Sequence, residues 1–197
     1  MMRLLLFLFV FWPTAALAGG IHAGIPVRSV PGIGPARFQT AQLGWTAPVE
    51  RGGLVRVFVG QTPEAAAQWY DIQRQTVTRP LPPLSMSADQ AHGDPTSMVM
   101  FLDGNVAVQV RADQGARDLA EALRAAIVDE GAADWPAPPS LRFHPDTNTY
   151  TVDAPDAFHI SFEGGARISR GQEPLRFSAP PQTVTAWDAL GRASVSR

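Results

Sequence analysis

The clearest pattern of hydrophobic and polar positions lies in residues 97–112, SMVMFLDGNVAVQVRA. Two apolar runs, 98–102 and 106–110, are separated by Asp103-Gly104-Asn105, residue types that tolerate the positive φ angles of tight turns. The pattern predicts a β-hairpin with a two-residue loop, either 103–104 or 104–105, because both loops keep the same side chains on each face. One face is wholly apolar and needs a cover: Val99, Phe101, Val106, Val108 and Val110.

The other face of the predicted hairpin is mixed. It carries the apolar side chains of Met98 and Met100 together with the polar side chains of Gln109 and Arg111. Such a face is too apolar for plain solvent, so we expect the C-terminal part of the chain or a partner protein to cover it. Met98 and Met100 are therefore candidate binding residues.

A strand and a helix are expected before the hairpin. Residues 54–59 alternate between the two faces of a strand. Thr62 then provides an N-cap and Pro63 a first helical position, which predicts the start of a helix. Trp69 and Ile72 follow at helical spacing, and we expect both to face the sheet.

A second helix is expected after the hairpin, with Asp113 as its N-cap and an end near Gly131. The order strand, helix, hairpin, helix predicts an α+β domain over residues 19–134, an antiparallel sheet with two helices packed on one face. The second helix contributes an apolar stripe to that packing: Ala116, Leu119, Ala120, Leu123, Ala126 and Ile127.

The composition changes after the Pro-rich stretch that begins at Trp135, and no helical pattern follows. Residues 135–197 are predicted to form a small β-rich C-terminal unit that packs against the first unit or extends its sheet. A turn at 188–192 is expected to join the last two strands as a hairpin. The predicted strands are short: 141–144, 149–153, 157–162, 166–168, 175–177, 183–187 and 193–196.

The N-terminus has the features of a secretory signal peptide, which we assign to residues 1–18. Arg3 precedes an unbroken apolar run over 4–12, and Ala16-Leu17-Ala18 gives a small-residue cleavage motif before Gly19. The predicted cut lies between Ala18 and Gly19 and directs the chain to the periplasm or the exterior. No later stretch is long enough to span a membrane, so we expect a soluble mature chain.

Composition excludes several functions. The chain has no cysteine, so neither disulfides nor a cysteine nucleophile is available. Its 16 basic and 18 acidic residues give a net charge of −2, without the basic field that nucleic-acid binding needs. The Gly32-Ile33-Gly34 triplet is flanked by prolines and does not resemble a phosphate loop. We therefore predict no nucleic-acid partner and no cofactor.

Two pairs of residues that contain histidine are the candidates for catalysis or metal binding. His92 and Asp94 lie two residues apart, and the alternative is that they belong to a surface loop. His144 and His159 occupy outward positions of predicted strands and could bind a metal ion with a nearby acid. The alternative for that pair is ordinary polar alternation on a half-buried sheet.

The remaining candidates are aromatic or lie near the new N-terminus. Trp135 and Trp187 are candidates for an exposed binding surface, and the alternative is that they cover the junction between the two units. His22 would suit square-planar copper or nickel if it were the third residue of the mature chain. The predicted cut makes it the fourth, which excludes that site.

The sequence thus favours an exported, non-enzymatic binding or accessory protein of the bacterial cell envelope, with an envelope protein as a partner. The alternative is a small periplasmic hydrolase or metal-dependent enzyme that uses His92 and Asp94, or His144 and His159. Convergence of these side chains in one pocket would distinguish the two functions.

Overall fold

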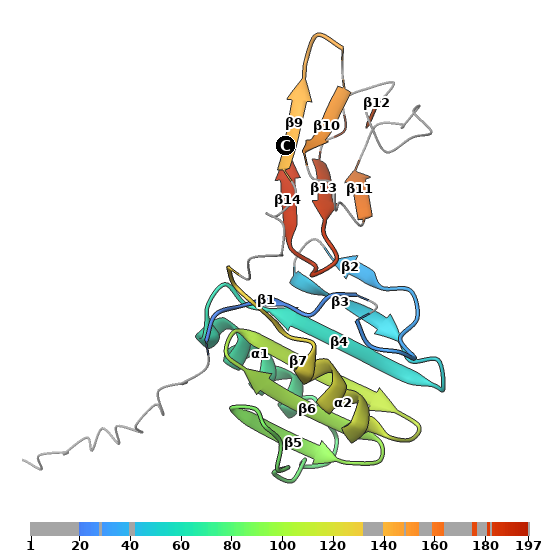
Figure 1. The fold of residues 1–197 in the computed structure, drawn as a ribbon, viewed down its shortest axis with the longest axis vertical. Coiled ribbons are helices and arrows are strands. Elements are labelled where there is room, and N and C mark those ends of the chain that lie inside the picture. Colours follow the sequence, from blue (N-terminus) through green and yellow to red (C-terminus); the bar gives the residue numbers. More distant parts are fainter. Residues whose placement is uncertain are drawn as a thin grey trace, which may run out of the picture.

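The main body of the computed structural model is a six-stranded antiparallel sheet in the order β2-β3-β4-β7-β6-β5 (Figure 1). The structure describes residues 20–27, 29–39, 42–131, 140–147, 149–153, 159–163, 175–176, 181 and 183–196. Two helices, α1 (Pro63–Gln75) and α2 (Ala116–Ala125), pack on the sheet, which confirms the predicted α+β class. The six strands are β2 (Arg37–Gln39), β3 (Gln42–Pro48), β4 (Gly53–Val59), β5 (Gln90–Asp94), β6 (Met98–Asp103) and β7 (Val106–Ala112).

The predicted hairpin forms as β6 and β7. Asp103 pairs with Val106 and Phe101 with Val108, so the two-residue loop is Gly104-Asn105. Gly104 has a φ of 52°, the left-handed conformation that this position of the turn requires. The side chains divide between the two faces as expected for either two-residue loop. The predicted hairpin is therefore confirmed.

The two helices lie on opposite faces of the sheet, and the prediction that both pack on one face is wrong. In Figure 1, α2 lies in front of the sheet and α1 behind it. Leu123 of α2 packs in the cluster of Phe101, whereas Tyr70 of α1 packs in the cluster of Met100. The reason is that both faces of the hairpin are apolar over β6, so each needs its own helix.

The start of α1 is confirmed, but part of its expected contact face is not. Thr62 caps the helix, its Oγ1 accepting a hydrogen bond of 3.3 Å from the amide of Ala65, and Pro63 occupies the first turn. Trp69 packs against Phe58, with ring centroids 5.4 Å apart. Ile72 is 51 % exposed and does not face the sheet, because Tyr70 and Ala66 provide the buried positions instead.

The bounds of α2 differ from the prediction at both ends. Its N-cap is Gly115, in the left-handed conformation at a φ of 70°, and not Asp113. The helix ends at Ala125, because the chain then extends into a short strand, β8 (Val128–Asp129). Among the described residues, no helix combines the length and the apolar character needed to cross a bilayer.

Pairing partners, more than local pattern, define several strands of the main body. β5 pairs with β6 along its whole length. The segment over 37–46 contributes to both β2 and β3, which pair with each other. β1 (His22–Gly24) pairs with β8, which brings the start of the described chain against the end of α2.

The residues that follow β1 belong to the core. Ile25 is fully buried, and its carbonyl accepts a hydrogen bond of 2.7 Å from Trp45 Nε1. Val27 and Ile33 join the same cluster beneath α2. A Gly- and Pro-rich stretch thus covers the front of β3 and β4 without forming a regular element of its own.

The C-terminal strands form two three-stranded sheets, β12-β10-β9 and β11-β13-β14. They lie where the sequence predicts strands, except that the expected strand at 166–168 falls outside the described residues. Tyr150, Val184 and Ala186 form their buried cluster. The strands are β9 (Ser140–His144), β10 (Thr149–Asp153), β11 (His159–Glu163), β12 (Leu175–Arg176), β13 (Thr183–Trp187) and β14 (Ala193–Ser196).

The turn between β13 and β14 attaches these strands to the main body (Figure 1). The amide of Gly191 donates to the carbonyl of Asp188 at 3.1 Å, which closes the predicted turn. The turn then bonds outward, because the amide of Val27 donates to Ala189 O at 2.7 Å and that of Gly44 to Gly191 O at 3.1 Å. The C-terminal unit therefore packs on the main body and does not extend its sheet.

Candidate functional site

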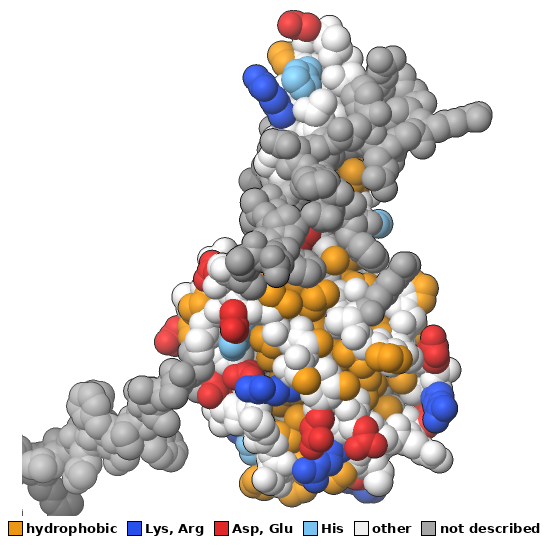
Figure 2. Space-filling view, in the orientation of Figure 1, with side chains coloured by type: hydrophobic (Ala, Val, Ile, Leu, Met, Phe, Trp, Pro, Cys, Tyr) orange, Lys and Arg blue, Asp and Glu red, His pale blue; other side chains and the backbone are white. Residues whose placement is uncertain are grey.

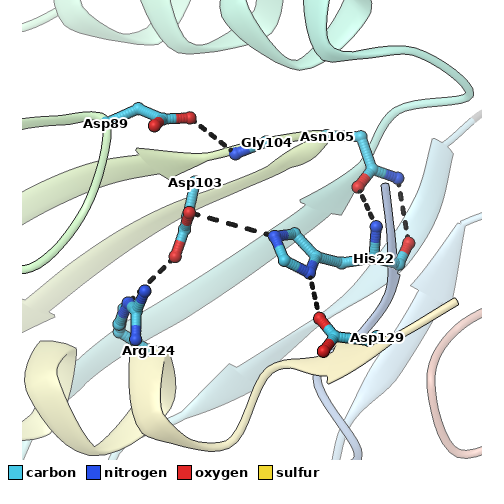
Figure 3. A network of polar contacts seen from close by, with 7 residues as sticks. All are labelled: His22, Asp89, Asp103, Gly104, Asn105, Arg124 and Asp129. Carbon is cyan, nitrogen blue, oxygen red and sulfur yellow. Dashed lines mark hydrogen bonds and ion pairs between the residues drawn. The ribbon is translucent and has the colours of Figure 1, made fainter. Parts of the chain in front are cut away.

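A network of polar contacts surrounds His22, the first residue of β1 (Figure 3). Its Nδ1 donates to Asp129 Oδ1 of β8 at 2.7 Å. Its Nε2 lies 3.9 Å from Asp103 Oδ1 at the end of β6 and is buried without a hydrogen-bond partner among the described residues. The ring is therefore enclosed by one carboxylate on each side, and only 14 % of the side chain is exposed.

Asn105, in the hairpin turn, holds the main chain of His22. The amide of His22 donates to Asn105 Oδ1 at 2.6 Å, and Asn105 Nδ2 donates to His22 O at 3.0 Å. The same Nδ2 donates to Gly60 O at 2.8 Å. A square-planar copper or nickel site at the N-terminus would need the His22 amide nitrogen as a ligand. In the structure this amide donates to Asn105 instead.

Two further contacts hold the turn itself. Arg124 Nε of α2 lies 2.9 Å from Asp103 Oδ2, close enough for an ion pair, although the N–H is misaligned and makes no hydrogen bond. This cation offsets the burial of the Asp103 carboxylate, which is 11 % exposed. The amide of Gly104 donates to Asp89 Oδ2 at 2.8 Å. The turn is thus connected to α2, β1 and the start of β5.

A cavity of about 350 Å³ adjoins this network. Asp129 and Glu130 give it an acidic side, and Asp129 is 79 % exposed despite its bond to His22. Figure 2 shows acidic side chains gathered beside a histidine on the left of the main body. The lining comes from distant parts of the chain: Ile21, His22, Ala23, Leu43, Val59, Gly60, Gln61, Asn105, Asp129, Glu130, Gly131 and Arg192.

Two other hollows lined by described residues are larger but gather fewer converging polar groups. One, of about 400 Å³, lies at the end of α1 and includes Met98 and Arg111. The other, of about 520 Å³, lies between α2 and the loops over 30–32 and 49–51, and its lining is mostly apolar. We therefore regard the cavity beside His22 as the candidate site, because side chains fixed by a polar network converge there.

The arrangement around His22 suits binding better than proton transfer. A general base needs a ring nitrogen that faces the substrate. In His22 one nitrogen is bonded to Asp129 and the other is buried against Asp103. The described lining holds no serine, threonine or tyrosine that the ring could activate. The groups available to a ligand include the free carboxylate oxygen of Asp129, Glu130 and the side chain of Gln61. Arg192, which pairs with Asp188, adds one cation to the lining.

A second network joins α1 to β5 and contains His92. His92 Nδ1 lies 2.7 Å from Tyr70 Oη, and Arg74 Nη1 lies 3.3 Å from His92 Nε2. Because arginine can only donate, Nε2 accepts and Nδ1–H donates to the phenol oxygen. Burial lowers the pKa of His92, and the Arg74 cation lowers it further. Burial also raises the pKa of Tyr70 to about 12.

The structure separates Asp94 from His92. Asp94 Oδ1 accepts hydrogen bonds from the hydroxyl and the amide of Thr96, at 2.7 and 2.9 Å, and Oδ2 accepts from Ser97 Oγ at 3.1 Å. These bonds lower the pKa of Asp94 and hold the turn before β6. The two residues lie on the edge strand β5, not in the loop that was the alternative, and each has its own partners.

His144 and His159 lie in different sheets and have different partners. His144 Nε2 lies 3.0 Å from Thr151 Oγ1 on the neighbouring strand. The ring of His159 stacks on Phe38 at a centroid distance of 5.8 Å and lies tilted against Trp187 at 5.5 Å. Within the described ranges, no three His, Asp or Glu side chains are close enough to hold a metal ion. Among the side chains that the structure describes, the predicted metal pair therefore has no third ligand.

Trp187 is 2 % exposed, so the prediction that it forms an exposed surface is wrong. It stacks on Phe38 of β2 at 5.8 Å and covers the junction between the main body and the C-terminal strands, as its alternative stated. Trp135 lies outside the described residues. Met100 is fully buried beneath α1 and presents no binding surface, whereas Met98 is half-buried and stays a candidate.

No family model, no curated protein and no solved structure matches the chain. Sequence reasoning missed the network around His22, because its partners lie 83 and 107 residues away. The one local signal was Asn105. The turn itself needs no carboxamide side chain at this position.

Proposed function

We propose that the chain is an exported, soluble, non-enzymatic binding or accessory protein of the bacterial cell envelope, and that the cavity beside His22 is its binding site. The signal-peptide pattern of residues 1–18 supports export. The occupant is an envelope protein segment or a smaller molecule that carries a positive charge to meet Asp129 and Glu130. No cofactor takes part in the proposed function.

The observation that carries the proposal is the way the cavity is built. Its lining combines residues of β1, β3, β4, β8, the hairpin turn and the turn after β13. Asn105 and Asp103 hold His22 in place before any ligand arrives. A site with side chains that are already fixed loses little conformational freedom on binding, which favours affinity.

The internal contacts of the histidines support a non-enzymatic role over a hydrolase. His22 and His92 each have both ring nitrogens facing protein groups. His144 bonds to a threonine, and His159 packs against the rings of Phe38 and Trp187. Contacts of this kind hold elements and junctions together, and they give neither His22 nor His92 a ring nitrogen that faces a substrate.

A photoreactive side chain placed at the rim of the cavity tests the proposal. Gln61 is exposed and lines the cavity, whereas Gln75 is exposed at the end of α1 and does not. We expect p-benzoylphenylalanine at position 61 to yield discrete adducts after irradiation of living cells, read by intact mass spectrometry, and the same group at position 75 to yield none. Equal adducts at both positions, or none at position 61, would contradict a binding role for this cavity.

Fractionation and turnover assays test the rest of the proposal. We expect the processed chain in the periplasmic or secreted fraction, with Gly19 as its first residue by mass spectrometry. We expect no turnover of chromogenic ester and phosphate-ester substrates by the purified chain. Turnover that disappears in His92→Gln, or in the double variant His144→Gln and His159→Gln, would instead establish the hydrolase alternative.

A further inference from the structure

Residues 20–22 are held between the hairpin turn and β8. Gly20 O lies against Gly104 so closely that any side chain on Gly104 would overlap it. The carbonyl of Ile21 accepts a hydrogen bond of 3.3 Å from the amide of Glu130. The amide and the carbonyl of His22 are both bonded to Asn105. The main chain of this segment is therefore already engaged before any other protein could bind it.

The predicted leader ends immediately before this segment. Only Gly19 separates the expected cut after Ala18 from Gly20. Proteases bind a substrate as an extended strand and use its main-chain N–H and C=O groups on both sides of the cut bond. The residues that a leader peptidase must accommodate next to the bond are the ones that pack against Gly104 and bond to Glu130. The same backbone cannot serve both partners at once.

We propose that residues 20–22 form a maturation latch, in which docking of this segment and cleavage of the Ala18–Gly19 bond exclude each other. The leader is removed while the segment is open, and the latch then closes over the new N-terminus. Closure completes the β1–β8 pair and one wall of the cavity beside His22. This inference rests on the proposed export of the chain.

Cleavage of the folded full-length chain by purified leader peptidase in detergent micelles tests the latch. Gly104→Ala opens it, because the added Cβ overlaps Gly20 O. The matched control is Gly115→Ala, which has a similar positive φ of 70° but whose Cβ meets nothing within 4 Å. We expect the Gly104→Ala chain to be cleaved at least about tenfold faster than the natural chain and the control, as the loss of two or more hydrogen bonds would produce.

A synthetic peptide of residues 1–30 provides the unlatched reference. It contains the bond but not the turn, so we expect it to be cleaved at least as fast as the Gly104→Ala chain. Equal rates for the natural chain and Gly104→Ala would overturn the latch and leave export standing. A peptide that is not cut after Ala18 would overturn both the leader assignment and the latch.

Trimming of the processed chain gives a readout that does not involve the leader. A chain that begins at Gly19 is incubated with an aminopeptidase and its mass is followed with time. We expect the natural chain to lose Gly19 and then stop, and Asn105→Ala to be trimmed past Gly20, because it lacks both bonds to the His22 main chain. The control is Asp71→Asn, a change at an exposed position of α1. Trimming of this variant should stop where trimming of the natural chain does. Trimming of the natural chain past Gly20 at the Asn105→Ala rate would contradict the latch.

Discussion

The two histidine networks of the main body place the same side chain in opposite surroundings. Carboxylates of Asp103 and Asp129 face His22, whereas a phenol and the Arg74 guanidinium face His92. The first network joins segments separated by 83 and 107 residues, and the second joins α1 to the nearby strand β5. The difference indicates that the first network holds the N-terminus in place and the second fixes a helix on its sheet.

The largest expected effect is in the second network. Tyr70 is fully buried and packs on Met100 and Leu102, so Tyr70→Ala creates a cavity and also removes the hydrogen bond to His92. We expect the free energy of unfolding to fall by about 3–5 kcal/mol, measured by urea denaturation. Tyr70→Phe keeps the ring and should cost about 1 kcal/mol. Equal losses in the two variants would contradict the packing role of the ring.

A smaller but still large effect is expected in the first network. Asn105 is 3 % exposed and makes three hydrogen bonds to the main chain of His22 and Gly60. We expect Asn105→Ala to lower the free energy of unfolding by about 2–3 kcal/mol. Hydrogen exchange should show that the amide of His22 loses its protection while that of Phe101, in the centre of the sheet, keeps it. Loss at both positions would mean that the variant unfolds globally.

The surroundings of His92 predict that the contribution of the second network to the free energy of unfolding depends on pH. The pKa of His92 is lowered in the folded chain by burial and by Arg74, whereas the unfolded chain titrates near the ordinary histidine value of 6.5. As the pH falls below that value, the unfolded state therefore binds the proton first. The contribution of neutral His92 to stability is complete above it and is lost over the pH window that extends downward from 6.5.

His92→Gln measures this effect directly. It cannot titrate, so we expect the difference in unfolding free energy between the natural chain and the variant to shrink as the pH falls through that window. The carboxylates of Glu64 and Asp94, whose pKa values are also lowered, titrate at more acidic pH and should not interfere. A difference that stays constant from pH 7 to pH 5 would contradict a neutral His92.

The smallest effect is expected at the exposed carboxylate of the first network. Asp129 is 79 % exposed, so its pair with His22 is screened by solvent. We expect Asp129→Asn to change the unfolding free energy by less than about 1 kcal/mol, by the same denaturation measurement. A loss comparable to that of Asn105→Ala would show that the ion pair, and not the main-chain bonds, holds the N-terminus.

Local patterns were sufficient for the parts of the fold that contain their own partners. Four such parts follow from residues close to one another in the chain: the β6–β7 hairpin, the Thr62 cap of α1, the turn that begins at Asp188 and the six C-terminal strands β9 to β14. Turn geometry and alternation fix such elements, because the hydrogen bonds that they need span only a few residues.

Of the candidate site, the sequence predicted little. His22 was considered only for a metal, and Asp129 was expected to lie at the end of a helix. In the structure the chain leaves the helix at Ala125 and forms β8, because β1 offers a pairing partner. That partner comes from the opposite end of the main body, so no window of sequence around either residue contains the information.

The sequence by itself determined the β6–β7 hairpin, β4, the C-terminal strands and which positions are apolar, whereas β1, β5 and β8 depended on their pairing partners. Only the tertiary structure decided that α1 and α2 take opposite faces, that Trp187 is buried at the junction and that Asn105 holds the start of the chain. The physical reason is that local elements are selected by backbone preferences and period. The side on which a helix packs and the partner that a polar side chain finds depend instead on which apolar surfaces remain uncovered and which buried polar groups still need a bond once the sheet has formed.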